Sequence, residues 1–395
     1  METLIRTYTQ QATSFQEQLF EWALHEGYAT VLWRLPNSAV IHCLIDFSAE
    51  IIPQPLQIGA WNEKKGFLFS PFENENLQKN LFLKADFYCN SAQILSEAES
   101  LFLRNKNFSP QNINHSTTNE VFLPDRHGLH TQHTHLVQQA IRAIEQKEFQ
   151  KVVLSRKEKV NFAQPVSVSK IFQNLCLLYP SAFVSAIYVP NYNIWIGASP
   201  EILVSVDKNN IFRTMALAGT QKYQAGANLS EITWTQKEIE EQALVSRYII
   251  NAFKKIRLRE FEEDGPKTIQ AGNLVHLRTD FWVNLNEVHY PHLWQVMLGL
   301  LHPTSAVCGM PKEESLSFIR TYEGYDREFY SGFLGPVNIE NETHIFVNLR
   351  CMQLLPTLQE AYLYAGGGIT ANSNPEKEWN ETLLKMETIL KAVSA

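Results

Sequence analysis

The segment that most constrains the fold lies near the end of the chain, AYLYAGGGITANSNPEKEWNETLLKMETIL at 361–390. A strand-like run rich in Tyr, Leu and Ala meets three consecutive glycines, Gly366 to Gly368, which leave backbone N–H groups exposed. After a polar turn, Asn374 suits the N-cap of a helix and Pro375 suits its first position. The segment therefore predicts a strand, a turn and a helix in close succession.

Three charged side chains share one face of that predicted helix. Glu378, Glu381 and Lys385 lie three and four residues apart, which places them in line along the helix. Two carboxylates and an ammonium beside exposed N–H groups could hold a cation together with an anionic ligand. The alternative is a solvated face with one Glu–Lys pair, worth about a few tenths of a kcal/mol. The segment alone leaves both interpretations open.

Composition excludes several classes of partner. The 395 residues include 34 basic and 41 acidic ones, a net charge of −7, and no Lys/Arg stripe that would follow phosphates. No run of about 18 apolar residues could span a membrane, and the N-terminus lacks the pattern of a signal peptide. The five cysteines are widely spaced without a C-x-x-C pair, which favours a reducing compartment. We expect a cytoplasmic protein without nucleic-acid or membrane partners.

The order of predicted elements favours an α+β fold. Residues 1–125 are predicted to form short strands and turns, with possible helices around 76–83 and 92–98, and 104–128 is predicted to be a loop or linker. Beyond it, strands come in antiparallel-looking runs separated by helices, without regular βαβ alternation, which suggests helices outside large sheets. Helices are predicted near 136–144, 168–178, 231–259, 291–300, 313–324 and from 375 onward. Strands are predicted at 151–156, 182–189, 193–198, 201–207, 211–217, 273–285, 331–339, 344–355 and 360–367.

Two ionisable side chains stand at the starts of predicted strands. Lys151 opens an apolar strand, where partial desolvation favours the neutral amine, the form that accepts a proton. Glu201 closes the segment GASPE, and apolar surroundings raise the pKa of a carboxyl until it can act as a general acid near neutrality. Taken singly, each has a simpler interpretation, a surface lysine beside an edge strand and an ordinary carboxylate at a strand start.

A metal site depends on two helices facing each other. Glu241, in the long helix predicted at 231–259, becomes a ligand only if another carboxylate lies opposite, and Glu381 is the candidate. Two carboxylates with waters and a substrate oxygen suit Mg²⁺. Most acidic helix positions are instead solvated, which is the alternative.

Histidines are the remaining candidates. The run RHGLHTQHTH contains His127, His130, His133 and His135, but no nearby Cys and no H-E-x-x-H pattern supports zinc, so we expect solvated or capping roles. His276 lies in an apolar strand, where a hydrogen-bonded core histidine is the default interpretation.

Nine sequence blocks, in one order, resemble a single family: QKVVLSR, GASPEIL, MALAGT, KEIEEQALV, NLVHL, LHPTSAVCGMPK, EGYDREFYSGFLGPV, VNLRC and GGGITANSNPEKEWNET. They are similar to the chorismate-utilising enzymes, which include anthranilate, aminodeoxychorismate, salicylate and isochorismate synthases. The resemblance covers about 130–395. It implies large, mostly antiparallel sheets packed as a central sandwich with helices outside. It also implies that 126–395 is the chorismate-binding catalytic region and 1–125 a divergent N-terminal part of one compact unit.

Three positions make the chain resemble the isochorismate synthases within that family. Lys151 matches the lysine of members that activate water. Ala218 stands where aminodeoxychorismate synthases carry an attacking lysine, and Ala306 stands where ammonia-using members usually have Thr. No glutamine amidotransferase domain is attached, so no such partner is expected. One departure is Gln242, where the family often has His, and we expect activity to survive it.

The resemblance also implies roles for the remaining residues. Mg²⁺ would be held by Glu241 and Glu381, with Glu378 acting through water, beside the ring carboxylate of chorismate. Lys151 would deprotonate a water that attacks C2, and Glu201 would protonate the leaving C4 hydroxyl. Substrate contacts would come from His276, Ala306, Tyr330, Arg350, Lys385 and the backbone of Gly366, Gly367 and Gly368.

Two other functions remain open at this point. A salicylate synthase would form isochorismate and then release pyruvate from the same site, and a non-catalytic protein would only bind chorismate. Retention of the Lys151 and Glu201 pair argues against the second. The sequence leaves open whether the product feeds menaquinone or catecholate siderophore synthesis. It also leaves the oligomeric state open, with a monomer favoured.

Overall fold

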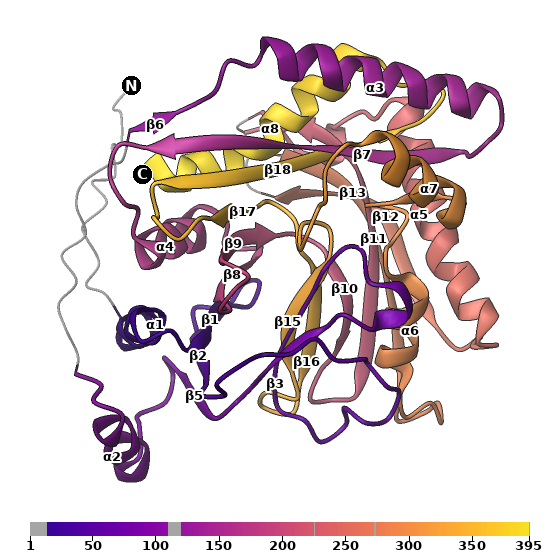
Figure 1. Cartoon of the computed structure of the whole chain (residues 1–395). Helices are drawn as coiled ribbons and strands as arrows, with labels where there is room; N and C mark the ends of the chain where they lie inside the picture. The colour runs from indigo at the N-terminus through magenta and orange to yellow at the C-terminus, as the bar shows by residue number, and fades with distance from the viewer. Residues whose placement is uncertain (1–13, 110–119, 225, 272–273, 395) are drawn as a thin grey trace.

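The computed structural model describes residues 14–109, 120–224, 226–271 and 274–394, and its strands form two large sheets (Figure 1). The larger, ten-stranded sheet runs in the spatial order β14 (Gly309–Met310), β7 (Lys151–Phe162), β18 (Glu360–Ile369), β17 (Cys351–Leu354), β9 (Ile194–Ser199), β8 (Phe183–Tyr188), β1 (Ala29–Arg34), β2 (Ile41–Asp46) and β5 (Phe87–Asn90), with β6 (Val121–Phe122) beside β7. The eight-stranded sheet runs β12 (Glu262–Ala271), β13 (Leu274–Asn284), β11 (Ile211–Lys222), β10 (Ile202–Val206), β16 (Thr343–Val347), β15 (Phe333–Val337), β3 (Gly66–Ser70) and β4 (Leu81–Lys84). The pairings between these strands are antiparallel.

Helices cover the outer faces of both sheets. Along the chain they are α1 (Phe15–His25), α2 (Glu97–Asn105), α3 (His127–Glu145), α4 (Val168–Leu178), α5 (Gln236–Lys255), α6 (Leu293–Leu301), α7 (Lys312–Tyr322) and α8 (Pro375–Ser394). Apolar clusters pack α1, α4 and α8 on the larger sheet and α5 and α6 on the smaller one. Figure 1 shows α3 and α8 side by side over β7 and β18.

A third apolar cluster lies between the sheets. It joins Trp33 of β1 and Phe183 of β8 to Phe67 of β3 and Phe346 of β16. The rings of Phe183 and Phe346 stack with centroids 4.1 Å apart, so side chains of the two sheets are in direct contact. The α+β class and the outer helices are confirmed.

The chain passes between the sheets at two places that matter for the site. The segment Pro200–Glu201 links β9 of the larger sheet to β10 of the smaller one, and Asn348–Arg350 links β16 back to β17. The two crossings are hydrogen-bonded to each other, because Val347 N donates to Glu201 O (3.1 Å) and Ala198 N donates to Arg350 O (3.0 Å). Glu201 and Arg350 are thereby held close together.

Most helices and strands predicted beyond residue 126 are present, and several predictions were wrong. The helix expected around 76–83 is a 3₁₀ turn at Glu75–Leu77 followed by β4, and α1 was missed. The strand expected at 344–355 is two strands in different sheets. The polar β12 was also missed, because an edge strand with one neighbour is mostly exposed and lacks alternating apolar residues. Residues 110–119 of the predicted 104–128 loop lie outside the described residues.

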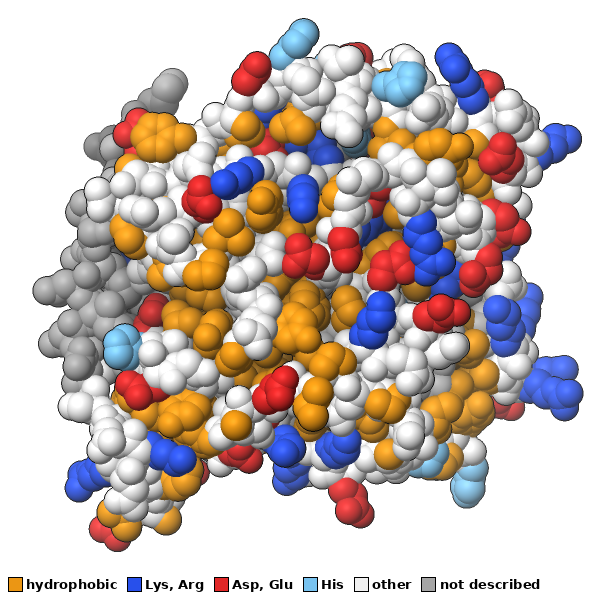
Figure 2. All heavy atoms as spheres, in the orientation of Figure 1, with side chains coloured by type: hydrophobic (Ala, Val, Ile, Leu, Met, Phe, Trp, Pro, Cys, Tyr) orange, Lys and Arg blue, Asp and Glu red, His pale blue; other side chains and the backbone are white. Residues whose placement is uncertain are grey.

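The surface carries both charges. On the face in Figure 2, basic and acidic side chains are interspersed with apolar ones, and no continuous basic stripe crosses that face. Within the described part of the chain, no helix has the length and apolar character needed to cross a membrane.

Candidate active site

The glycine strand lies directly beside the strand that begins with Lys151. In the β7–β18 pairing, Gly368 is opposite Val153 and Gly366 is opposite Ser155. A Cβ atom on Gly368 would fall 2.8 Å from Lys151 Cε and would overlap the carboxylate of Glu241. The missing side chain therefore makes room for a lysine and a glutamate above the strand.

Three carboxylates reach this strand from two helices. Glu241 comes from α5, and Glu378 and Glu381 come from the first turns of α8. Asn374 caps α8 as predicted, since Asn374 Oδ1 accepts from Lys377 N at 3.1 Å. The cap fixes where α8 begins and so which face it turns to β18.

Each of the three carboxylates has an ammonium partner in this structure. Glu241 Oε1 lies 3.0 Å from Lys151 Nζ, and Glu381 Oε1 lies 2.6 Å from Lys385 Nζ. Glu378 Oε1 lies 3.1 Å from Nζ of Lys237, a residue that the sequence analysis missed. The signal was available, because Lys237 lies four residues before Glu241 on one face of the same helix.

Burial and these partners shift the carboxylates in opposite directions. Burial alone would raise the pKa of Glu241, but the ammonium groups of Lys151 and Lys237 lower it to about 2. For Glu378, burial prevails over the nearby Lys237 and raises the pKa to about 7. The pKa of Glu241 is therefore lowered and the pKa of Glu378 is raised, although the two carboxylates lie in one small region.

The carboxylate oxygens of this region are the ligands that a hard divalent cation prefers. In this structure they are not arranged around a common point as a coordination site. No group of three or more His, Cys, Asp or Glu side chains in the described residues is arranged to bind a metal. However, Glu378 Oε2 is buried without a hydrogen-bond partner among the described residues. It faces Gly367, and a Cβ atom added to Gly367 would lie 3.1 Å from it. Carboxylate oxygens with free lone pairs are suitable ligands for Mg²⁺, provided that the carboxylates give up their ammonium partners.

Glu201 sits at the crossing between the sheets and is buried (4% exposed). Burial raises its pKa to about 8, and the positive charges of Lys151, Arg350 and Lys385 limit that rise. A carboxyl with such a pKa is largely protonated at neutral pH and can donate a proton. The predicted base, Lys151, is therefore close enough to the predicted acid, Glu201, for its charge to influence the pKa of that acid.

His276 and Arg350 offer free hydrogen-bonding atoms beside that acid. His276 Nδ1 lies 2.8 Å from the carbonyl oxygen of Gly219, which requires Nδ1 to carry the proton and leaves Nε2 as an acceptor. Burial lowers the pKa of His276 to about 3, so the ring is neutral. Its Nε2 and Arg350 Nη1 are buried and without partners among the described residues. The default interpretation, a core histidine whose ring nitrogens both have hydrogen-bond partners, is therefore wrong for Nε2 of His276.

The other predicted substrate-binding residues are placed as follows. Tyr330 stacks on Tyr364, and its hydroxyl would lie 3.1 Å from a Cβ on Gly366. Lys385 Nζ donates to the carbonyl oxygen of Gly366 at 2.7 Å. Ala306 lies in the loop that leads into β14, whose Met310 pairs with Lys151. Thr370, which follows β18, was not among the predicted residues; its hydroxyl is buried and has no hydrogen-bond partner among the described residues.

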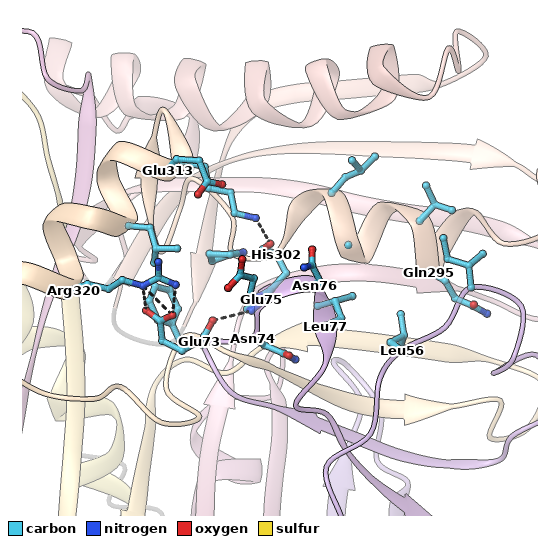
Figure 3. Close-up of a pocket in the computed structure, with 18 residues that line it drawn as sticks. Leu56, Glu73, Asn74, Glu75, Asn76, Leu77, Gln295, His302, Glu313 and Arg320 are labelled. Carbon is cyan, nitrogen blue, oxygen red and sulfur yellow. Dashed lines mark hydrogen bonds and ion pairs between the residues drawn. The ribbon is translucent and has the colours of Figure 1, made fainter.

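The space among these side chains is small. A cavity of about 20 Å³ beside His276 and Arg350 has room for little more than a water. A cavity of about 490 Å³ lies elsewhere, between the turn at 73–77 and helices α6 and α7, and no predicted site residue lines it (Figure 3). Binding of a ring-sized substrate at the predicted site requires side chains to move, as metal binding does.

Among the described residues, no group of three or more His, Cys, Asp or Glu that could hold a metal ion includes the histidines of 127–135. His130 Nε2 contacts Glu376 Oε2 at 2.9 Å on the surface of α3 and α8. The solvated or capping role expected for His133 is wrong, because this side chain is buried (3% exposed) beside Trp379. Helix α3 begins at His127, with Arg126 in the cap position.

The chain belongs to the family of chorismate binding enzymes, whose match covers residues 60–394. Among curated relatives, the isochorismate synthase MenF of Escherichia coli K12 is 30% identical over 289 residues, 69% of this chain and 63% of that protein. The isochorismate synthase of salicylate biosynthesis from Pseudomonas aeruginosa is 32% identical over 66% of this chain and 54% of its own length. The chain thus spans less than two thirds of these relatives.

Solved structures agree on the fold. The menaquinone-specific isochorismate synthase MenF from Escherichia coli superposes with a TM-score of 0.74 at 22% identity, over 97% of this chain and 92% of that one. Anthranilate synthase component I from Streptococcus pneumoniae superposes with a TM-score of 0.66 at 17% identity, over 98% and 95%. The predicted fold of chorismate-utilising enzymes is confirmed.

Proposed function

We propose that this chain is an isochorismate synthase, an isomerase that converts chorismate reversibly into isochorismate. The observation that carries the proposal is a buried lysine, Lys151, within the same small region as a buried acid, Glu201, whose pKa is raised to about 8. Curated relatives that bear the name isochorismate synthase support it.

The reaction uses one base and one acid on the two sides of the ring. Lys151 takes a proton from a water whose oxygen bonds to C2. The double bonds shift, the C4–oxygen bond breaks, and Glu201 gives its proton to the departing hydroxyl, which leaves as water. One water is consumed and one is released, so the sum is an isomerisation, and in reverse the two residues exchange roles.

We propose Mg²⁺ as the cofactor, with Glu241 and Glu381 as ligands and Glu378 acting through water. When bound, Mg²⁺ neutralises the ring carboxylate of the substrate. Ion pairs join these carboxylates to Lys151, Lys237 and Lys385.

Substrate binding uses the unpartnered atoms of the site. Arg350 Nη1 and the N–H groups of the Gly366–Gly368 strand suit the enolpyruvyl carboxylate, since a guanidinium is a strong partner for carboxylates. Tyr330 lies over that strand, His276 Nε2 accepts from a substrate hydroxyl, and Ala306 borders the ring. We place the enzyme in the cytosol, with its product used for menaquinone or catecholate siderophores.

The test is product analysis with purified protein. With chorismate and Mg²⁺ we expect isochorismate, with isochorismate we expect chorismate, and with ammonium we expect no aminated product. Both directions are followed by chromatography and pyruvate by an enzyme-coupled assay. Stoichiometric pyruvate would reassign the chain to the salicylate synthases, and binding of chorismate without turnover would indicate a non-catalytic protein.

The metal arm of the same assay uses chelation and two matched variants. EDTA should stop turnover and added Mg²⁺ should restore it. Glu241→Gln should reduce turnover by orders of magnitude, whereas Glu240→Gln, an exposed neighbour that contacts Gln236, should leave it unchanged. Full turnover in EDTA would contradict the metal assignment.

A further inference from the structure

A second cavity, of about 270 Å³, lies under helix α3, where the edge of β7 meets the turn at 322–325. We call it the α3 cavity and define it by His133, Ser155, Arg156, Lys157 and Tyr325, which line it. None of the residues proposed for catalysis lines it. Ligand sites for drug-sized molecules have volumes of ~300–1,000 Å³, so this one suits a smaller molecule.

Two polar side chains in its wall are almost fully buried and incompletely bonded. Arg156 is 6% exposed; its Nη1 donates to Glu158 (2.7 Å), its Nε donates to Thr382 (2.8 Å), and Trp379 lies 4.0 Å from its Cζ. Its Nη2 has no hydrogen-bond partner among the described residues. Both ring nitrogens of His133, which is 3% exposed, also lack partners there. Buried donors in this state favour a ligand that accepts hydrogen bonds.

The carboxylates of Glu158 and Glu323, close to the cavity, already have ion-pair or hydrogen-bond partners. Glu158 pairs with both Arg156 and Arg126. Glu323, the carboxylate in the wall, accepts from Ser155 N, from Ser155 Oγ (2.7 Å) and from Arg327.

Positive charge therefore exceeds negative charge around this cavity. Among the side chains that line it, Arg156 and Lys157 supply two cations against the one carboxylate of Glu323, and the carboxylate of Glu328 lies near Lys157. In a chain of net charge −7 this is a local reversal of sign, and it favours an anionic occupant.

The rest of the wall is suited to a ring. Leu129, Leu136 and Tyr322 line one part of the cavity, and the Lys157 ammonium lies 5.4 Å from the ring centre of Tyr325. The Tyr325 hydroxyl is 2.6 Å from Ser155 Oγ, so a hydroxyl pair stands beside the cations. Apolar and aromatic walls with a few converging polar groups are typical of small-molecule sites.

We propose that the α3 cavity binds a small cyclic carboxylate, with the carboxylate at Arg156 Nη2 and the ring against Leu129, Leu136 and Tyr322. Lys157 follows Arg156 in β7 and leaves the strand on the other face, so it contributes positive charge at the edge of the cavity. His133 offers one donor and one acceptor to the same ligand, because burial keeps its imidazole neutral. No residue assigned to the proposed active site lines the cavity, although its Ser155 is opposite Gly366 in the β7–β18 pairing. The proposal does not depend on the proposed function.

The test measures benzoate binding by calorimetry in an Arg350→Gln background, which removes the guanidinium assigned to the substrate carboxylate. We expect one benzoate per chain. Arg156→Gln should weaken binding at least tenfold and Lys157→Gln several-fold. Lys159→Gln is the matched control, since Lys159 is exposed on the same strand and pairs with Glu360, and it should change nothing. Benzoate should also shift the ring resonances of His133.

A blocking variant covers the possibility that Arg156→Gln does not fold. Gln132 is exposed on α3 and lines the cavity, so Gln132→Trp should fold and occlude the opening. Loss of benzoate binding in Gln132→Trp supports the site. Benzoate binding that survives both Lys157→Gln and Gln132→Trp overturns it. Absence of benzoate binding at millimolar concentration, or binding of inorganic phosphate alone, overturns the carboxylate assignment.

Discussion

Two buried ion pairs that contact the first half of β7 show how structure and function differ at single positions. Arg327 and Glu323 are both buried, and their polar atoms are bonded to each other and to Val153 O, Val307 O and Ser155. Loss of either partner would leave an uncompensated charge inside the protein, so the role of this pair is structural. Lys151 is equally buried, but among the described residues its ion-pair partner is a single carboxylate, that of Glu241. A buried ammonium held by one exchangeable partner is suited to proton transfer.

Lys151→Met tests the proposed base. The variant keeps the length of the side chain but cannot accept a proton, so turnover of chorismate should fall by ~10²–10⁴-fold. Affinities for Mg²⁺ and chorismate, measured by calorimetry, should stay within a few-fold. Lys159→Met, on the exposed part of the same strand, serves as the control. A variant that retains more than half of the turnover would show that another group is the base.

Glu201→Gln tests the raised pKa of the proposed acid. The pKa of Glu201 is about 8 in the folded chain against 4.5 for an ordinary Glu. Its contribution to stability is therefore present below about pH 4.5 and is lost as pH rises through about 8. Gln does not ionise, so the melting temperature of the variant relative to wild type should rise between pH 5 and pH 9, by at least about 2 °C.

Two further measurements complete that test. The infrared band of a protonated carboxyl should disappear as pH rises through about 8, and the band should be absent from Glu201→Gln. Glu240→Gln, at an exposed position of α5, should show no such pH-dependent difference in melting temperature. A relative melting temperature that is constant with pH would contradict the assignment.

At the scale of elements, the site is made by strand pairing and helix capping. The helix start at Pro375, the shared face of Glu378, Glu381 and Lys385, and the glycine strand could be predicted, because each is set by residues close in sequence. The pairing of β18 with β7 could not, since it joins segments about 200 residues apart and depends on packing of the whole sheet.

The crossings between sheets were also beyond local patterns. The run HIFVNLRCMQLL is largely apolar and was predicted as one strand. In the structure it leaves one sheet at Val347 and enters the other at Cys351, with Arg350 in the left-handed region (φ 51°). Nothing in the local sequence marks a change of sheet, because both halves are buried equally. For the same reason the sequence did not predict that Arg350 and Glu201 lie on hydrogen-bonded crossings.

Gly368→Ala tests the glycine strand as an element. The added Cβ would overlap the Glu241 carboxylate and lie 2.8 Å from Lys151 Cε, so both side chains must shift. Since a displacement of about 1 Å costs ~10²-fold in rate, turnover should fall by about that factor, and Mg²⁺ affinity should weaken. The melting temperature should change little. Gly128→Ala in α3, where nothing lies within 4 Å of the new Cβ, is the control.

A different result would show that the site does not depend on the missing side chain at Gly368. If Gly368→Ala kept wild-type turnover and Mg²⁺ affinity, Glu241 and Lys151 would not need their present positions. That outcome would leave the fold intact and remove the argument that the glycines create space for the acid and base.

At the scale of the whole molecule, the two sheets are built from both ends of the chain. Residues before 126 supply β1, β2, β5 and β6 to the larger sheet and β3 and β4 to the smaller one. The site lies where strands from later in the chain cross between those sheets. The boundary predicted near 125 therefore separates sequence blocks of different resemblance, while the strands on its two sides are hydrogen-bonded neighbours.

This shared architecture predicts how a fragment would behave. If 126–395 is produced alone, β8 loses the five residue pairs it makes with β1, and β15 loses the five it makes with β3. The apolar cluster between the sheets loses Trp33 and Phe67. Two long unpaired edges and exposed apolar side chains should make the fragment aggregate. Solubility, circular dichroism and calorimetry of the fragment measure this.

The full chain and a two-part chain provide the comparison. The full chain should unfold in one calorimetric transition, because β1 and β3 tie the N-terminal residues into both sheets. Co-expression of 1–125 with 126–395 should restore soluble, active protein, since the missing strands can pair again without a covalent link. A soluble, active 126–395 fragment would show that the later strands close both sheets unaided. In that case the N-terminal strands would be an addition to the catalytic unit, and the site would owe its geometry to the later residues alone.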